Sequence, residues 1–297
     1  MSFSIKIQEL EDRNLTSKEF YRVLTSLMKH EVYYLRLLHV SDAINDIEAY
    51  PLQIAERIVT SLDTLYTVIE SCHDYVSANA LVRNLADSVS AFVLIYKKSS
   101  GEERILRHYL YIMDGLKTRI SQLPDDIQKK DNISEADFNA LRAQIIAAKT
   151  NFTDTFEFCQ NEIKKLQLYQ DNQQWCETWA IKSCKWRFQE VGKKTDYSWK
   201  SIYDVLELES KEFFSGLSEY VHGLSTSNLC VEKDENTFVA PYSIATCLIG
   251  KFREAIETIF ASDMTVVKQN MVSVIRDPNV LPYLLTICGL ANDKGKV

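Results

Sequence analysis

The sequence predicts an all-α protein, an irregular multi-helix bundle of about nine to eleven helices. The chain holds 8 Gly and 5 Pro among 297 residues, where average usage would give about 35 such residues. No Gly occurs before residue 101. Apolar residues recur three and four positions apart through most of the sequence, which is typical of amphipathic helices. Because Gly supplies the positive φ angles of hairpin turns and phosphate-binding loops, its scarcity disfavours most nucleotide-binding architectures.

Four helices are expected in the first 123 residues. Thr16 and Glu19 have the spacing of a capping box, so the first helix should run from about residue 17 to residue 39. Pro51 suits the first turn of a second helix. The apolar stripe of that helix contains Ile54, Ile58, Leu62, Leu65, Ile69 and Val76. A third, strongly apolar helix is expected over 78–98, and a fourth runs between Gly101 and Pro124.

One long central helix is expected around residues 134–170. Ser134 and Asp137 have helix-capping spacing, and apolar residues keep a helical period as far as Tyr169. The polar segment 124–132 before it is the best candidate for a flexible connection. We expect one helical domain over 1–297, with a possible subdivision into 1–123 and 134–297. Polar breaks near 191–196 and 225–236 separate shorter helices in the remainder.

Charge and cysteine usage indicate the class of protein. With 34 basic and 41 acidic residues, the net charge is −7, which argues against binding polyanions over the whole surface but allows a local basic patch. The 7 Cys form no Cys-x-x-Cys pair and fit reduced thiols packed as small hydrophobic groups. The N-terminal residues lack a signal-peptide pattern, and the most apolar run, Val89–Tyr96, is too short to span a bilayer. We expect a soluble, cytoplasmic protein with no cofactor and no membrane partner.

A polar line interrupts the apolar third helix. Arg83, Asp87 and Ser90 follow one another at spacings of four and three, so they share one stripe of the helix. Two interpretations stay open. The stripe is an outward-facing salt bridge, or it faces a cleft in which Arg83 binds an anion.

The residues Ser218, Tyr220, His222 and Gly223 mark an expected helix end. Gly223 suits a C-cap, and His222 can interact with the negative end of the helix dipole. A structural cap is therefore one interpretation. His222 is also a candidate proton donor or acceptor, because imidazole titrates near neutral pH.

Two Glu-x-x-His pairs provide another candidate site. In ferritin-like di-iron proteins, two such pairs from two helices join one Glu from each of two others. The sequence offers Glu70 with His73 and Glu219 with His222, and Glu31 and Glu190 as the further carboxylates. A di-iron protein is therefore one interpretation of the sequence. The other interpretations need no metal.

Aromatic and basic residues are concentrated between 175 and 200. All 4 Trp lie in this range, and aromatic rings among cations can stack bases and neutralise phosphates. The candidate nucleic-acid-binding residues are Trp199, Lys182, Lys185 and Arg187. The spacing of the other three Trp, at 175, 179 and 186, equally predicts a core stripe on one helix face.

The pair Arg83 and Asp87, then Trp199, then the string from Leu217 to Gly223 resemble an uncharacterised family of all-helical bacterial proteins, over about residues 75–260. Such families are similar to the HEPN and abortive-infection helical bundles, many of which are RNases or toxins of phage-defence and toxin–antitoxin systems. In the HEPN nuclease pattern, an Arg and the polar residue next to it are followed by a His after four to six intervening positions. Here Arg83 and Asn84 are followed by no such His.

Two functions follow from these patterns and the resemblance. The first is an interaction protein of a bacterial defence or stress system, which binds a protein partner, a second copy of itself, or RNA or DNA through a basic patch. Ser218 and Tyr220 are candidate binding residues. The alternative is a metal-independent, HEPN-like RNase. In it the resemblance implies that Arg83 binds the scissile phosphate, His222 exchanges the proton, and Asp87 orients one of them.

Overall fold

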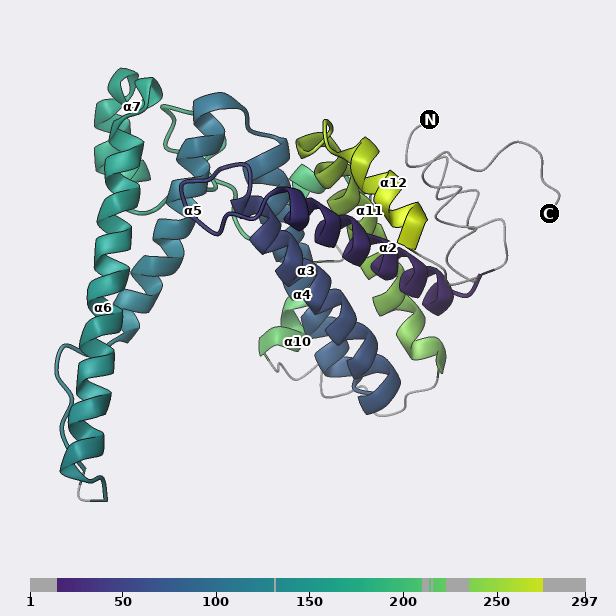
Figure 1. The fold of residues 1–297 in the computed structure, drawn as a ribbon, viewed down its shortest axis with the longest axis horizontal. Helices are drawn as coiled ribbons and strands as arrows, with labels where there is room; N and C mark the ends of the chain where they lie inside the picture. Colours follow the sequence, from purple (N-terminus) through teal and green to yellow (C-terminus); the bar gives the residue numbers. More distant parts are fainter. Residues whose placement is uncertain (1–14, 131, 210–213, 215, 223–234, 275–297) are drawn as a thin grey trace. The chain divides into compact units, whose positions relative to one another are not determined.

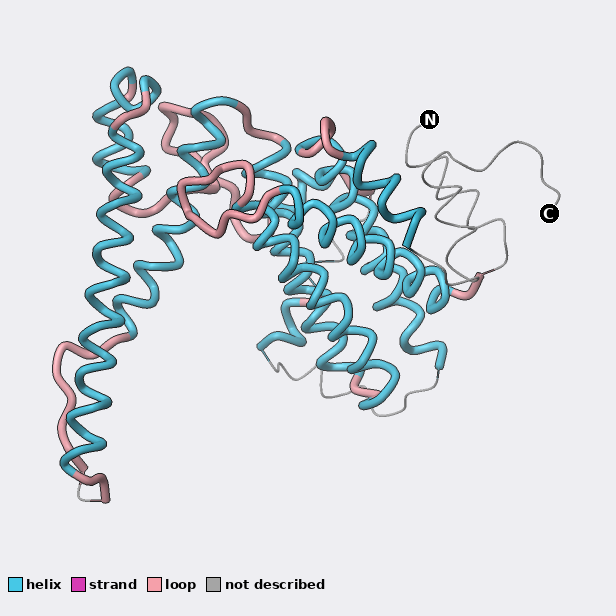
Figure 2. The backbone as a smooth tube through the Cα atoms, viewed as in Figure 1, coloured by secondary structure: helices cyan, strands magenta, loops and turns pink. Residues whose placement is uncertain are grey.

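The structure, a computed structural model, describes residues 15–130, 132–209, 214, 216–222 and 235–274. These residues form helices and loops, with no strand in the described ranges, and the all-α prediction is confirmed (Figure 2). One isolated β-bridge joins Phe188 and Asp196. Short π-helical and 3-10 turns, labelled η, extend or connect several of the α-helices.

The chain divides into two compact units. The first unit combines residues 1–98 with residues 199–297, and the second contains residues 99–198. This division differs from the subdivision into 1–123 and 134–297. The helix that begins at Gly101 packs against the long helix that follows it, so both belong to the second unit.

The first unit is built from elements at both ends of the chain (Figure 1). Its elements are α2 (Ser17–Leu38), α3 (Tyr50–Thr67), η1 (Val68–Cys72), α4 (Tyr75–Phe92), η2 (Val93–Lys97), η4 (Ser201–Leu206), α10 (Ser218–His222), η6 (Glu235–Phe238), α11 (Val239–Ile259) and α12 (Met264–Val274). Helix α2 packs against α3, α11 and α12, and α4 packs against α3, α10 and α11. Segments far apart in the sequence therefore share one core.

The start of α2 agrees with the sequence prediction. The Thr16 hydroxyl accepts a hydrogen bond from the Glu19 amide at 3.2 Å, and the Thr16 amide donates to the Glu19 carboxylate at 2.9 Å. This reciprocal capping box satisfies amides that have no partner inside the helix. Pro51 also lies in the first turn of α3, as its fixed φ favours.

The boundary between α3 and α4 differs from the prediction. Helix α4 begins at Tyr75, because the Asp74 carboxylate accepts hydrogen bonds from the amides of Val76 at 3.0 Å and Ser77 at 3.1 Å. His73 has a left-handed φ of 50° and ends the preceding π-helical turn. Val76 therefore belongs to α4 and not to the apolar stripe of α3. Asp74 has the N-cap role that aspartate commonly takes.

The combined helix Tyr75–Lys97 is strongly apolar. It has 23 residues, and an 18-residue window in it has a mean hydropathy of 1.2, so by length and composition it could cross a membrane. However, 67% of that window is buried inside the protein. Most of this apolar surface is therefore packed against other parts of the protein.

A buried ion pair crosses the core of the first unit. Arg253 on α11 is 1% exposed and Glu31 on α2 is fully buried. The Arg253 Nε lies 2.9 Å from one Glu31 oxygen and 3.0 Å from the other, and its Nη2 lies 2.6 Å from the first. Glu257, at 3.1 Å, is a second carboxylate partner. This geometry compensates charges that would otherwise be costly to remove from water.

The second unit contains a helical hairpin and a compact irregular segment. Its elements are α5 (Gly101–Gln122), α6 (Glu135–Lys164), α7 (Gln167–Asp171), α8 (Gln173–Trp175) and η3 (Cys176–Ala180). The long helix α6 opens with the predicted Ser134 cap, since the Ser134 hydroxyl accepts from the Asp137 amide at 3.2 Å. It ends at Lys164, earlier than the expected 170. The cause is Glu102, whose carboxylate accepts the amides of Gln167 at 3.1 Å and Leu168 at 2.6 Å and so starts a new helix.

Arg107 on α5 organises the irregular segment. Its side chain is 2% exposed, and its guanidinium donates to the carbonyl oxygens of Trp186 at 2.8 Å and Phe188 at 2.7 Å. It also lies 3.6 Å from the centre of the Phe188 ring and 2.8 Å from the Glu103 carboxylate. Burial lowers the pKa of Arg107, and Glu103 partly offsets that effect. The group thus joins α5 to a backbone that has no regular hydrogen-bond ladder.

The predicted Trp stripe is buried in part but does not lie on one helix. Trp175 is 6% exposed and Trp186 is 2% exposed, as the packing interpretation requires. However, the helix ends near Ala180 with a π-helical turn, so Trp186 follows on a non-helical segment. The Trp186 indole donates to Asp114 at 3.1 Å. Trp175 and Trp186 are therefore both buried in the core, but they do not lie on the same helix.

The buried ion pair gives a first prediction. Glu31→Ala leaves Arg253 with one partly exposed carboxylate, and we expect a loss of about 3–5 kcal/mol in the free energy of unfolding. The matched change Glu56→Ala removes a half-exposed carboxylate 3.4 Å from Arg36, and should cost less than about 1 kcal/mol. Urea unfolding followed by circular dichroism measures both values. Equal losses in the two variants would contradict the assigned role.

The buried thiols give a pH prediction for the second unit. Burial raises the pKa of Cys159 to about 12 and those of Cys176 and Cys184 to about 11, from an ordinary value of 9.0. The folded state holds these protons more tightly than the unfolded state. Their contribution to stability is therefore complete below pH 9 and is lost as the pH rises through 11–12.

Urea unfolding followed by Trp fluorescence, at about pH 8 and about pH 10, measures this loss. Cys159→Ala should make the fall in stability between the two pH values shallower. Cys72→Ala, at an exposed thiol, should leave it unchanged. The same fall in Cys159→Ala as in the unaltered protein would show that the buried thiol does not cause it.

Candidate functional site

Arg83 and Asp87 form the ion pair predicted on the third helix, and the structure adds Tyr203 to it. The Arg83 guanidinium pairs with the Asp87 carboxylate one turn further along α4. The Tyr203 hydroxyl, on η4, donates to the same carboxylate at 2.8 Å. The centre of the Tyr203 ring lies 5.0 Å from the guanidinium carbon. Tyr203 thus contacts both members of the pair, and sequence spacing gave no sign of it.

The pair is more buried than an ordinary surface salt bridge. The Arg83 side chain is 11% exposed, the Asp87 side chain is 32% exposed, and Ser90 is fully buried. Among the described residues, the Arg83 Nε and the Ser90 hydroxyl have no hydrogen-bond partner. Burial, and then the Asp87 carboxylate, raise the pKa of Tyr203, so this phenol stays protonated and remains a donor. The arrangement matches neither the outward-facing salt bridge nor the cleft completely. Arg83 and Asp87 are paired with each other, and η4 covers them through Tyr203.

Helix α10 packs against α4, the helix that carries Arg83. The Tyr220 ring meets Tyr75 edge to face, with centres 5.7 Å apart, and Ser218 is half-buried. The side chain of His222 and all of Gly223 lie outside the described residues. The meeting of Arg83 with His222 at one phosphate therefore stays a prediction.

The candidate nucleic-acid residues fall in both units. Lys182, Lys185 and Arg187 belong to the second unit, and Trp199, whose ring is 48% exposed, belongs to the first. Two of the three cations are used within their own unit. Lys185 lies 2.9 Å from the Asp196 carboxylate, and the Arg187 guanidinium donates to a carbonyl oxygen at 2.9 Å.

Of the three cations Lys182, Lys185 and Arg187, Lys182 is the exposed one. Its carbonyl oxygen accepts a hydrogen bond from Lys117 at 3.0 Å. The contacts of Lys185 and Arg187 hold the irregular segment together, which is a structural role. They leave less positive charge for a phosphate backbone than the sequence suggested.

The carboxylates proposed as iron ligands in the described residues already have other partners. Glu70 pairs with Lys18 and accepts the Tyr242 hydroxyl at 2.8 Å, and these contacts lower its pKa despite the opposing effect of burial. Glu31 is held by Arg253, as described above, and Glu190 pairs with Lys193 at 2.6 Å. The side chains of Glu219 and His222 lie outside the described residues. Within the described part of the chain, no group of three or more His, Cys, Asp or Glu could hold a metal ion.

Two exposed apolar surfaces were missed by the sequence analysis. One lies at the end of α2, where exposed charged positions such as Lys29 give way to apolar ones. Its residues and exposed fractions are Tyr33 (56%), Leu37 (55%), Leu38 (47%) and Val40 (76%). The signal was present in the sequence, because apolar residues here occur on more than one helix face.

The second surface lies on α6, in the second unit. Of its 30 residues, two have buried side chains, Cys159 and Ile163, and both are near its C-terminal end. Leu141 is 44% exposed and Ile146 is 54% exposed. We call residues 134–150 the distal half of α6. Helix α5 packs against α6 but ends at Gln122, so part of α6 extends beyond it (Figure 1).

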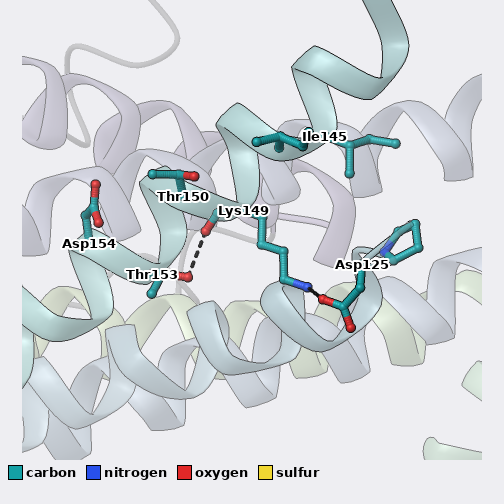
Figure 3. A pocket seen from close by; sticks show the side chains of 8 residues that line it. Asp125, Ile145, Lys149, Thr150, Thr153 and Asp154 are labelled. Carbon is teal, nitrogen blue, oxygen red and sulfur yellow. Dashed lines mark hydrogen bonds and ion pairs between the residues drawn. The ribbon is translucent and has the colours of Figure 1, made fainter. Parts of the chain in front are cut away.

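The loop after α5 follows α6 on a different side from α5 (Figure 2). An open hollow of about 240 Å³ separates the start of this loop from α6. Figure 3 shows Lys149 reaching from α6 to Asp125, and the two form an ion pair. The Thr153 hydroxyl donates to the Lys149 carbonyl at 2.8 Å in the same view. The loop is thus fixed along one flank of α6.

No protein-family model, curated protein or solved structure matches the chain.

The Tyr203 contact gives a prediction. Tyr203→Phe removes the hydroxyl that donates to Asp87 but keeps the ring beside Arg83, and we expect a loss of about 1–2 kcal/mol in the free energy of unfolding. Tyr33→Phe, at an exposed ring, is the matched control and should cost nothing measurable. Urea unfolding of both variants provides the test. A Tyr203→Phe protein as stable as the control would show that the hydrogen bond contributes nothing.

Proposed function

We propose that this protein is an all-helical interaction protein that binds another protein through the distal half of α6. The observation that carries this proposal is the long helix whose N-terminal part has no buried side chain. Burying an exposed Leu or Ile side chain against a partner would contribute about 1.5–3 kcal/mol of favourable free energy for each side chain. Large apolar side chains that remain exposed on one helix are typical of interaction sites in soluble proteins.

The apolar end of α2 supports the same class of function. Tyr33 and Leu37 are four positions apart and share one exposed face of α2, and Val40 follows just after the helix ends. An aromatic ring among aliphatic side chains is typical of the central part of protein interfaces. Each compact unit thus has its own exposed apolar surface.

The nucleic-acid and RNase alternatives receive less support from the geometry. Lys185 and Arg187 are engaged within the second unit, and Arg83 is engaged by Asp87 and Tyr203. The resemblance to bacterial helical bundles adds the further proposal that the protein is part of a defence or stress system. The proposed cytoplasmic location rests instead on the 7 Cys, which form no Cys-x-x-Cys pair and fit reduced thiols.

The surface on α6 can be tested by partner capture. A tagged full-length chain is cross-linked in its own cells, and the captured proteins are identified by mass spectrometry. Leu141→Arg together with Ile146→Arg should reduce capture of a specific partner at least about tenfold, because charge is introduced into the apolar surface. The control Asn161→Arg adds the same charge at an exposed position of α6 outside the distal half, and should capture normally.

Circular dichroism and thermal unfolding check that the variants fold equally well. Equal capture by all three proteins would contradict a role for this surface. Saturable binding of a short single-stranded RNA, lost in Lys182→Glu, would favour the nucleic-acid class instead. Fluorescence anisotropy at physiological salt measures that binding.

A further inference from the structure

The segment that follows α5 is joined to α6 by three ion pairs. We call this segment, residues 124–130, the strap, and Figure 2 shows it running along α6. The pairs, in chain order along the strap, are Asp125 with Lys149, Asp126 with Arg142 at 3.9 Å, and Lys129 with Glu135 at 2.8 Å. The strap and the helix thus run in opposite directions, and opposite charges meet at all three places.

The charged residues that hold the strap form one line on α6. Glu135, Arg142 and Lys149 are separated by seven positions each, which is close to two helical turns, so they share one side of the helix. With 3.6 residues per turn, Ile145 and Ile146 lie on either side of this line. The strap therefore follows α6 between two apolar side chains.

The strap restricts access to this part of α6. Ile145 and Ile146 line the open hollow of about 240 Å³ on the side of α6. The strap contributes Pro124 and Asp125 to the same hollow. A partner protein that packs against both isoleucines therefore has to displace the strap from the line between them.

The attachment of the strap is electrostatic. The Asp125 and Asp126 side chains are 96% and 75% exposed, so their ion pairs are individually weak and are screened by salt. Within the described ranges, no backbone–backbone hydrogen bond joins the strap to α6. Ile127 is half-buried, and the other side chains of the strap are exposed. Breaking the ion pairs is therefore enough to release the strap, without unfolding a core.

The chain between the two helices is long enough to move away from α6. Helix α6 rises about 21 Å between Glu135 and Lys149. The ten residues from Asp125 to Glu135 can extend to about 33 Å. The strap can therefore leave the surface of α6 while both helices stay wound.

We propose that the strap is an autoinhibitory segment, which keeps a partner protein from the flank of α6 at Ile145 and Ile146 until its ion pairs are broken. This inference rests on the proposed function, because it assigns regulation to the same surface of α6. Salt weakens all three pairs at once. The balance between a held and a lifted strap therefore responds to ionic strength.

The position of the strap can be measured in the full chain. Spin labels at the exposed positions Gln128 and Asn139 report the separation of strap and helix by electron paramagnetic resonance. Attaching the labels to a non-natural keto side chain avoids the 7 Cys. Raising NaCl from about 0.02 to about 0.5 M shortens the Debye length, and should convert a single short distance into a mixture with a longer one.

An exchange of charges tests the ion pairs themselves. Lys149→Glu places a carboxylate beside Asp125 and should raise the lifted fraction at least about threefold at low salt. Adding Asp125→Lys restores a pair of opposite charge and should return the lifted fraction to that of the unaltered protein. The control Asp154→Lys reverses an exposed charge that lines the hollow but forms no ion pair among the described residues, and should change nothing.

Partner capture tests the regulation. Asp125→Asn together with Asp126→Asn releases the strap and leaves α6 itself unaltered. Cross-linking capture of the partner identified with the unaltered chain should rise at least about threefold. Adding Ile146→Arg should remove this gain, because the released surface is then no longer apolar. The control Asp154→Asn should capture like the unaltered chain, and circular dichroism confirms that all variants keep their helices.

Two outcomes would overturn the inference. One is a strap distance that neither salt nor Lys149→Glu changes. The other is capture that does not rise in Asp125→Asn with Asp126→Asn although the strap has lifted. If capture is then still lost in Leu141→Arg with Ile146→Arg, the proposed function stands and the strap does not regulate it. A strap that lifts as expected, with capture unaffected by those two arginines, would contradict the proposed function and the autoinhibition together.

Discussion

Burial of the Arg253 guanidinium constrains the first unit more than any other interaction. A charge at that depth requires a carboxylate in bidentate reach, and Glu31 of α2 supplies it from the other end of the chain. The pair fixes how α2 and α11 approach each other. Around them α3, α4 and α12 pack apolar faces, and α4 in turn positions the Arg83 and Asp87 stripe against Tyr203. In the second unit, buried Arg107 has the corresponding role, because it joins α5 to the backbone of an irregular segment.

Contacts within the second unit, including those of buried Arg107, explain why the basic and aromatic residues between 175 and 200 are less available than their number suggests. Trp175 and Trp186 fill the second unit's core, and the cations near them hold the segment's own backbone and carboxylates. What remains for partners is apolar. Helix α6 is longer than α5, and the proposed function depends on the exposed apolar side chains in the part of α6 beyond the end of α5.

Much of the secondary structure could be predicted because its causes are local. The capping box at Thr16, the N-cap at Ser134, the proline in the first turn of α3, and the breaks at Gly101 and Pro124 depend on neighbours within about four residues. Errors arose where a distant group intervened. Glu102 ends the long helix early by capping α7 from α5, and the Trp positions share a core without sharing a helix. The start of α4 at Asp74 was a local signal that the apolar period concealed.

The sequence by itself determined the all-α class, most helix boundaries and the pairing of Arg83 with Asp87, since each follows from backbone geometry and from contacts one helical turn apart. Only the tertiary structure decided which charged and polar side chains are engaged by distant parts of the chain. Tyr203, Glu31 and Arg107 reach their partners across tens or hundreds of residues, and no periodicity in the chain encodes such contacts. The exposed stripe on α6 has the same origin, because whether an apolar face is core or surface depends on where the neighbouring helix ends.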